Sequence, residues 1–248
     1  MIGTSRPAIA ERIGDYGSVV TNTSGLTLPL IALSAMLLFL LPLAVAFFAG
    51  DCVAGEAAWG SLRYTLARPH SRGRLLGCKA VVAAGLAAAA VIIPVFTAVL
   101  SGSIAFGWHP LTVIDLQNTS AFFIASATFS PLEAVARILL SVCFVLATLS
   151  STFAFALLLS TMTSRPFSAV AGGVGLDLAS RALDNVPGLH ALGQWLPATD
   201  AGTTLWSGFF ATPAQFAGVG HVLIVQGAYT AAFLAAAFYW FSRADILT

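Results

Sequence analysis

Three charged residues interrupt an otherwise apolar stretch of the chain, and their spacing could support chemistry inside a membrane. Asp177, Arg181 and Asp184 follow i, i+4 and i+7 spacing, which places them on one face of a helix. An ionised group in hydrocarbon costs about 2.5–3.5 kcal/mol on insertion scales unless it pairs or faces water, so these are candidate functional residues. Two interpretations stay open: structural pairing of the charges, or lining of a path for a polar substrate.

A second concentration of charge lies between residues 51 and 79. This segment holds five of the eleven basic residues, namely Arg63, Arg68, Arg72, Arg74 and Lys79. By the positive-inside rule, a segment so rich in Arg and Lys is cytoplasmic. It could bind a partner protein, or it could be an ordinary positive loop that only fixes the topology.

The chain lacks the sequence signatures of an enzyme. A nucleotide-binding P-loop needs a lysine after glycine, and the only lysine, Lys79, follows Cys78 instead. No HExxH zinc motif and no GxSxG nucleophile is present. The three cysteines have no CxxC spacing, which argues against a zinc site or a disulfide framework. We therefore expect no catalytic residue, cofactor or metal in this chain.

The glycine-rich run 172–175 superficially resembles a dinucleotide-binding loop. It lies inside an apolar stretch and lacks the third glycine of GxGxxG. Small residues four apart, Ala169 with Gly173 and Ala171 with Gly175, instead favour close packing against a neighbouring helix.

The elements that must position these residues are transmembrane helices. The 248-residue chain is 58% hydrophobic and 8% charged, where a soluble domain carries roughly 25% charge. A span needs about 20 apolar residues. The sequence predicts a single all-α membrane domain over residues 1–248, with about five spans at residues 26–49, 80–106, 138–162, 166–184 and 219–241. A cleaved signal peptide is the weaker alternative for the first run, which exceeds the usual 7–15 apolar residues.

If residues 51–79 are cytoplasmic and successive spans cross the membrane in opposite directions, residues 107–137 and 185–218 lie outside and the C-terminus lies in the cytoplasm. Residues 116–132 are uncharged and would invert everything after them if they crossed the membrane. Seven of these 17 residues are polar, which favours an interfacial or re-entrant outer segment. Glu133 and Arg137 form an i, i+4 pair at this outer interface, where a structural role is expected.

Residues 53–67 can form a short helix along the membrane surface, which Pro69 would end because proline lacks an amide and clashes with the preceding turn. Glu56 would lie in its first turn, where a carboxylate favours the exposed amides. Gly60 would leave one face of this helix without a side chain, so that the backbone of a partner protein could approach closely. Arg63 would supply a positive charge one turn further along the helix. Such a helix is a lever by which a cytoplasmic partner could move both flanking spans.

This segment resembles the cytoplasmic signature of ABC type-2 exporter permeases. The matching positions are Asp51, Glu56, Gly60-Ser61-Leu62, Leu66, Pro69, Ser71-Arg72 and Lys79, and the tail Phe241-Ser-Arg-Ala-Asp-Ile246 is similar to the end of the family's last span. The resemblance implies that residues 53–69 form a coupling helix seated on an ATPase subunit. It makes Glu56, Gly60, Arg63, Pro69 and Arg72 candidate coupling residues.

The resemblance further implies an exporter subunit that pairs with a second permease chain, identical or homologous, and with two copies of a separate ATPase that binds ATP and Mg. The family ordinarily has six spans, with one before the span at 26–49, whereas residues 1–25 of this chain are polar. Two interpretations stay open: the first helix is missing, or the start codon was placed late. Ten of the eleven basic residues are Arg, which fits a GC-rich bacterial genome, and we expect a multi-pass protein of the inner membrane. A net charge of +1 gives no reason to expect nucleic acid. A non-transporting regulator or assembly protein and a secondary transporter are the alternatives, and the substrate stays unassigned.

Overall fold

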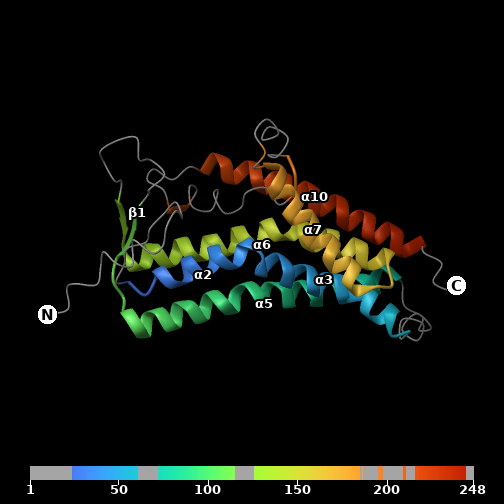
Figure 1. Ribbon diagram of the computed structural model, residues 1–248, viewed down its shortest axis with the longest axis horizontal. Helices are drawn as coiled ribbons and strands as arrows, with labels where there is room; N and C mark the ends of the chain where they lie inside the picture. The colour runs from blue at the N-terminus through green and yellow to red at the C-terminus, as the bar shows by residue number, and fades with distance from the viewer. Residues whose placement is uncertain are drawn as a thin grey trace.

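A bundle of long helices makes up the computed structural model (Figure 1), which describes residues 24–60, 72–114, 126–184, 186, 195–197, 209–210 and 216–243. Its elements are α2 (Thr27–Leu38), α3 (Leu40–Ala58), α5 (Arg72–Phe106), β1 (Leu111–Ile114), β2 (Ser126–Phe129), α6 (Pro131–Met162), α7 (Pro166–Asp184) and α10 (Phe216–Arg243). Within the described ranges, four helices are long and apolar enough to cross a membrane: Leu40–Ala58, Gly73–Phe106, Pro131–Met162 and Gly218–Arg243. The all-α membrane fold expected from the sequence is confirmed.

The first apolar run is broken into two helices. α2 ends at Leu38, and α3 begins at Leu40 after Phe39 leaves the helical region with φ −147° and ψ −43°. Pro42 explains the break, because its ring clashes with the carbonyl group four residues earlier, at Leu38. Pro42 itself lies in the first turn of α3, where no intrahelical amide bond is needed. The predicted span 26–49 therefore corresponds to α2 and the first half of α3.

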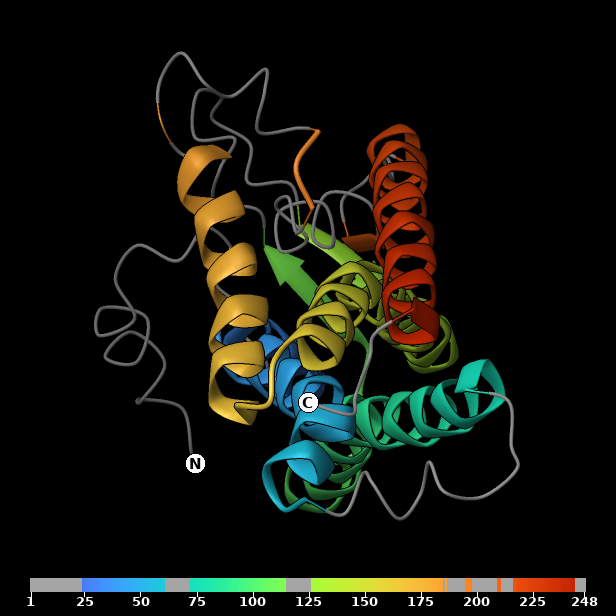
Figure 2. The same cartoon turned by 90° about the vertical axis from the view of Figure 1, so that its right-hand side faces the viewer.

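Helix α6 lies at the centre of the bundle. It packs against α3, α7 and α10, and α3 also packs against α5 and α7. The end-on view in Figure 2 shows α7 and α10 on opposite sides of α6. The end of α3, the turn between α6 and α7, and the end of α10 lie at one end of the bundle, whereas β1 and the start of α2 lie at the other (Figure 1).

A two-stranded hairpin forms at the end opposite the α6–α7 turn. β1 pairs antiparallel with β2, with Leu111 opposite Phe129 and Ile114 opposite Ser126. Ile114 and Ser126 therefore lie side by side at the same end of the bundle. Residues 116–125 of the predicted interfacial or re-entrant segment lie outside the described residues, so that interpretation stays a prediction.

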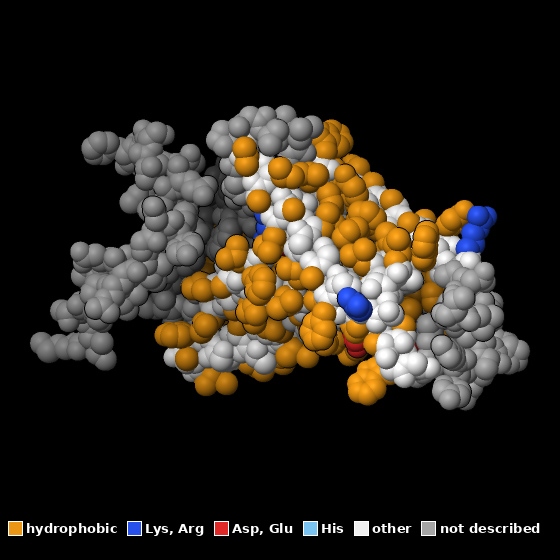
Figure 3. All heavy atoms as spheres, turned by 45° about the vertical axis from the view of Figure 1, so that its right-hand side comes forward, with side chains coloured by type: hydrophobic (Ala, Val, Ile, Leu, Met, Phe, Trp, Pro, Cys, Tyr) orange, Lys and Arg blue, Asp and Glu red, His pale blue; other side chains and the backbone are white. Residues whose placement is uncertain are grey.

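The outward faces of the helices are apolar, as Figure 3 shows over much of the visible surface. On α5 the exposed hydrophobic side chains include Val81, Ile93, Phe96 and Ile104, the last at 84% exposure. Such surface is stable only in contact with lipid or another apolar surface. Polar and charged side chains buried inside the bundle are therefore the candidates for a functional role.

Candidate functional site

The end of α3 carries the residues that the sequence placed in a separate coupling helix. α3 continues without interruption to Ala58, because no proline breaks it after Pro42. Its end is set by Gly60, which has φ +70°, a backbone conformation that glycine adopts at helix C-termini with little strain. The amide of Gly60 donates to the carbonyl of Ala57 at 3.1 Å, and the amide of Trp59 donates to that of Gly55 at 3.1 Å.

The prediction of a new helix beginning at Val53 is therefore wrong. Glu56 lies in the last turn of α3 rather than in a first turn, and Gly60 ends the helix rather than opening one of its faces. Arg72 is the first residue of α5. Arg63 and Pro69 lie outside the described residues, so the coupling role of residues 61–71 stays a prediction.

A salt bridge joins the ends of α3 and α5. The ammonium of Lys79 on α5 contacts the carboxylate of Glu56 on α3, with side-chain exposures of 15% and 37% respectively. Lys79 Nζ also donates to the carbonyl oxygen of Cys52 at 3.5 Å. A carboxylate near a helix C-terminus is unfavourable next to the negative end of the helix dipole, and the lysine offsets this. The two helices that flank residues 61–71 are thus tied by one cation.

A cleft of about 560 Å³ opens between these two helix ends. Its polar lining is Asp51, Glu56 and Lys79, and two native cysteines, Cys52 on α3 and Cys78 on α5, face it from opposite walls. Phe47, Phe48, Trp59, Val82 and Leu86 supply the apolar part of the lining.

The intramembrane charges form a compact ion pair on α7. Arg181 Nε lies 2.9 Å from Asp177 Oδ2, and Arg181 Nη2 lies 3.3 Å from Asp177 Oδ1. The Asp177 side chain is 1% exposed and that of Arg181 is 19% exposed. Asp184 is the last residue of α7, and its side chain is outside the described part of the structure. The geometry brings Asp177 and Arg181 together and supports the pairing interpretation.

Comparison with known families decides the identity of the chain. Residues 8–246 match the family described as ABC-2 family transporter protein. This chain belongs to that family. Neither the curated proteins nor the solved structures contain a match to it. The chain is thus a membrane subunit of the ABC-2 transporter type, and membership of this family implies an ATPase partner.

Small residues of the permease allow α7 to pack closely on α3 and α6. A Cβ atom at Gly173 would lie 2.9 Å from Ala156 Cβ and 3.1 Å from Ala46 Cβ. The predicted packing by Ala169 and Gly173 is confirmed, because both are buried. Ala171 and Gly175 are exposed, and a Cβ at Gly175 would meet nothing within 4 Å, so these two residues pack against no other helix in the described part of this chain. Ala171 and Gly175 each lie two positions after the buried Ala169 and Gly173, and on a helix this spacing places them on nearly the opposite face.

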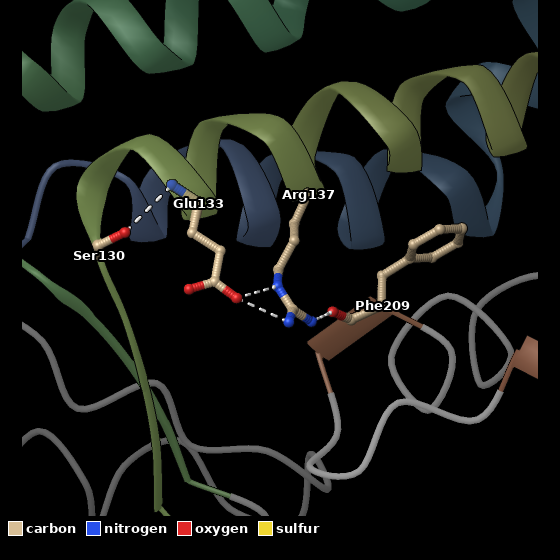
Figure 4. A network of polar contacts seen from close by, with 4 residues as sticks. All are labelled: Ser130, Glu133, Arg137 and Phe209. Carbon is tan, nitrogen blue, oxygen red and sulfur yellow. Dashed lines mark hydrogen bonds and ion pairs between the residues drawn. The ribbon is translucent and has the colours of Figure 1, made fainter.

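The opposite end of the permease is organised around Arg137 (Figure 4). Arg137 donates to Glu133 Oε1 at 2.8 Å from Nη2 and at 3.2 Å from Nε, and it also donates to the carbonyl of Phe209. Its guanidinium lies 4.2 Å from the ring centroid of Phe129. Ser130 caps α6 by accepting from the Glu133 amide at 3.4 Å, which explains why α6 begins at Pro131 rather than near residue 138. The structural role expected for this pair is confirmed.

Sequence reasoning missed one buried polar contact between helices. Ser160 of α6 is 1% exposed, and its hydroxyl oxygen accepts hydrogen bonds from the backbone of α3. Serine is common in membrane helices and usually bonds to its own helix, so no local pattern distinguishes this residue.

Proposed function

We propose that this permease is the membrane subunit of an ATP-driven exporter and that residues 61–71 receive movement from the separate ATPase. The observation that carries the proposal is the link between Glu56 and Lys79, which joins the two helices leading into and out of this segment. A displacement of residues 61–71 would act on α3 and α5 together. The family membership supports an ATPase partner for this movement.

The transport path requires a second permease chain in this proposal. Helix α6 fills the centre of the bundle, with its core side chains buried against α3, α7 and α10. A path wide enough for a substrate would then run between two chains, each engaging one ATPase that holds ATP and Mg. The second chain is a copy of this one or a homologue.

We propose that the end of the bundle carrying the α6–α7 turn and the end of α10 faces the cytoplasm of a bacterial cell. Arg165 in that turn, Arg243 at the end of α10, and Arg74 and Lys79 at the start of α5 place positive charge at this end. This distribution supports the orientation by the positive-inside rule.

Coexpression with the ABC ATPase encoded nearest to this gene tests the function. We expect the wild-type permease to co-purify with that ATPase and to stimulate its ATP hydrolysis. Replacing residues 61–71 with a Gly/Ser linker of the same length that carries two lysines should lower the recovered ATPase at least tenfold. The lysines preserve the positive charge that orients the chain. The matched control is the same kind of linker at residues 187–194, which should leave ATPase recovery unchanged.

Retention of the ATPase by the 61–71 linker variant would remove this segment from the mechanism. A wild-type permease that binds no ATPase would instead favour a regulator or a secondary transporter.

Thiol labelling of intact cells tests the orientation, in a Cys143→Ser background. Thr128 is exposed in β2, so Thr128→Cys should react with a membrane-impermeant maleimide before permeabilisation. Cys52 and Cys78, which line the cleft at the opposite end, should react only after permeabilisation. The reverse order of labelling would invert the proposed topology.

A further inference from the structure

A hydroxyl group of α6 accepts hydrogen bonds from backbone amides of α3, near the end of α3 that leads into residues 61–71. Ser160 Oγ accepts from the amide of Val53 at 3.0 Å and from the amide of Ala54 at 2.9 Å. In a regular helix these two amides donate to carbonyl groups four residues earlier in α3. A side chain inserted into that series bends a helix or fixes its path. In hydrocarbon, where water cannot replace a lost partner, such bonds are retained.

Two other buried serines of the same helix behave differently. Ser141 Oγ donates to the carbonyl of Arg137 at 2.8 Å, and Ser151 Oγ donates to the carbonyl of Thr148 at 3.3 Å. Both serines are 0% exposed, as deeply buried as Ser160, yet their bonds stay within α6. The contact of Ser160 with α3 is therefore a specific connection between helices and not a general consequence of a buried serine.

The turn of α3 that Ser160 contacts is also held by α7. A Cβ atom on Gly50 would lie 2.9 Å from Val170 Cγ2 and 3.0 Å from Val170 N, so the two backbones approach as closely as glycine permits. Val53 and Ala54 are 3% and 0% exposed. Gly50, Val53 and Ala54 are thus enclosed by α6 and α7, and they cannot shift without disturbing both.

The contact of the same region with α5 is less enclosed. Lys79 reaches the Cys52 carbonyl and the Glu56 carboxylate across the edge of the cleft, and Glu56 is 37% exposed. Solvent reaches part of this ion pair and screens it, although the Lys79 side chain is only 15% exposed. The connections of α3 to α6 and α7 are therefore buried and involve its backbone. Helix α5 meets α3 through the partly exposed ion pair of Lys79 and through Leu76, which lies in the same apolar cluster as Val53.

We propose that Ser160 is a positioning residue that makes α3, α6 and α7 move as one unit. The inference rests on the proposed function, since the movement enters through residues 61–71. Ser160 holds the α3 turn at residues 53–54, and this turn transmits the displacement to α6. Loss of the hydroxyl lets α3 move without α6, so ATP hydrolysis no longer drives the bundle.

The test compares Ser160→Ala with Ser160→Thr, which keeps the hydroxyl, and with Ser151→Ala as a matched buried control. In lipid nanodiscs without ATPase, hydrogen exchange of the Val53 and Ala54 amides should become about fivefold faster in Ser160→Ala only. With the ATPase bound, Ser160→Ala should co-purify like wild type but lose at least two thirds of the permease-dependent stimulation of ATP hydrolysis. Ser160→Thr should retain that stimulation.

Unchanged exchange at residues 53 and 54 in Ser160→Ala would overturn the proposed connection. Faster exchange with full stimulation would overturn the positioning role and leave an ordinary packing contact. If the wild-type permease binds no ATPase, the proposed function fails and the positioning role fails with it, while the exchange measurement still reports whether the hydroxyl holds the α3 turn.

Discussion

Arg181→Ala is expected to lower the stability of the folded permease by about 3–5 kcal/mol, the usual cost of removing one partner from a buried ion pair. The substitution leaves the Asp177 carboxylate at 1% exposure without the cation that lies 2.9 Å from it. The second polar group near this carboxylate, the hydroxyl of Thr152 on α6, carries no charge and cannot replace the guanidinium. The measurement is the yield of monodisperse protein in detergent, together with its thermal unfolding midpoint.

The double variant Asp177→Ala with Arg181→Ala should recover more than half of the lost stability. It removes both charges, so no uncompensated ion remains in the α7 interior, and the two substitutions are then strongly non-additive. Glu133→Ala is the matched control, because Glu133 belongs to an i, i+4 pair of the same kind but is 47% exposed. It should cost about 1 kcal/mol or less. Single and double variants with equal, small effects would show that the buried pair has no structural importance.

Lys79→Glu is expected to uncouple ATP hydrolysis by the ATPase from the permease. The substitution places a second carboxylate opposite Glu56, so repulsion replaces attraction between the ends of α3 and α5. Membrane insertion should be unaffected, because the site is partly exposed at the end of the bundle. We expect permease-dependent ATP hydrolysis to fall at least fivefold while the ATPase still co-purifies.

The reciprocal exchange Glu56→Lys with Lys79→Glu restores the attraction and should return at least half of the stimulated hydrolysis. The native cysteines provide an independent measurement, because Cys52 and Cys78 line the same cleft. In a Cys143→Ser background, a short bifunctional thiol reagent should link them less efficiently in Lys79→Glu than in wild type or in the exchanged pair. Equal linking in all three proteins, with unchanged hydrolysis, would remove the α3–α5 ion pair from the mechanism.

Local features of the sequence determined the class of the protein and much of its secondary structure. Long uncharged apolar runs indicate helices in lipid, because a membrane leaves no alternative that satisfies backbone amides within one segment. The i, i+4 spacing of Asp177 with Arg181 and of Glu133 with Arg137 was enough to predict both ion pairs, because helix geometry alone brings such residues together. The ordered residues of the segment 51–79 pointed to the family that residues 8–246 match.

Two local signals were present but misjudged. Pro42 breaks the first apolar run at Phe39, and Gly60 ends α3, so both boundaries follow from known backbone preferences of proline and glycine. The error of starting a coupling helix at Val53 came from assigning the end of the first span by hydropathy. Hydropathy reports where lipid ends, whereas a helix continues into water until a residue stops it.

Contacts between distant residues were decided only by the tertiary structure. Val53 and Ser160 are 107 positions apart, and Cys52 and Lys79 are 27 positions apart, so neither contact has a periodic signal in the sequence. The β1–β2 hairpin likewise depends on pairing across residues 115–125. Each of these contacts requires that whole helices first pack at particular rotations and depths, and packing depends on the shapes of all neighbouring side chains at once. The apolar pattern specifies that a helix is buried in the membrane, but the small residues and hydroxyls of its neighbours determine which of its faces meets which helix.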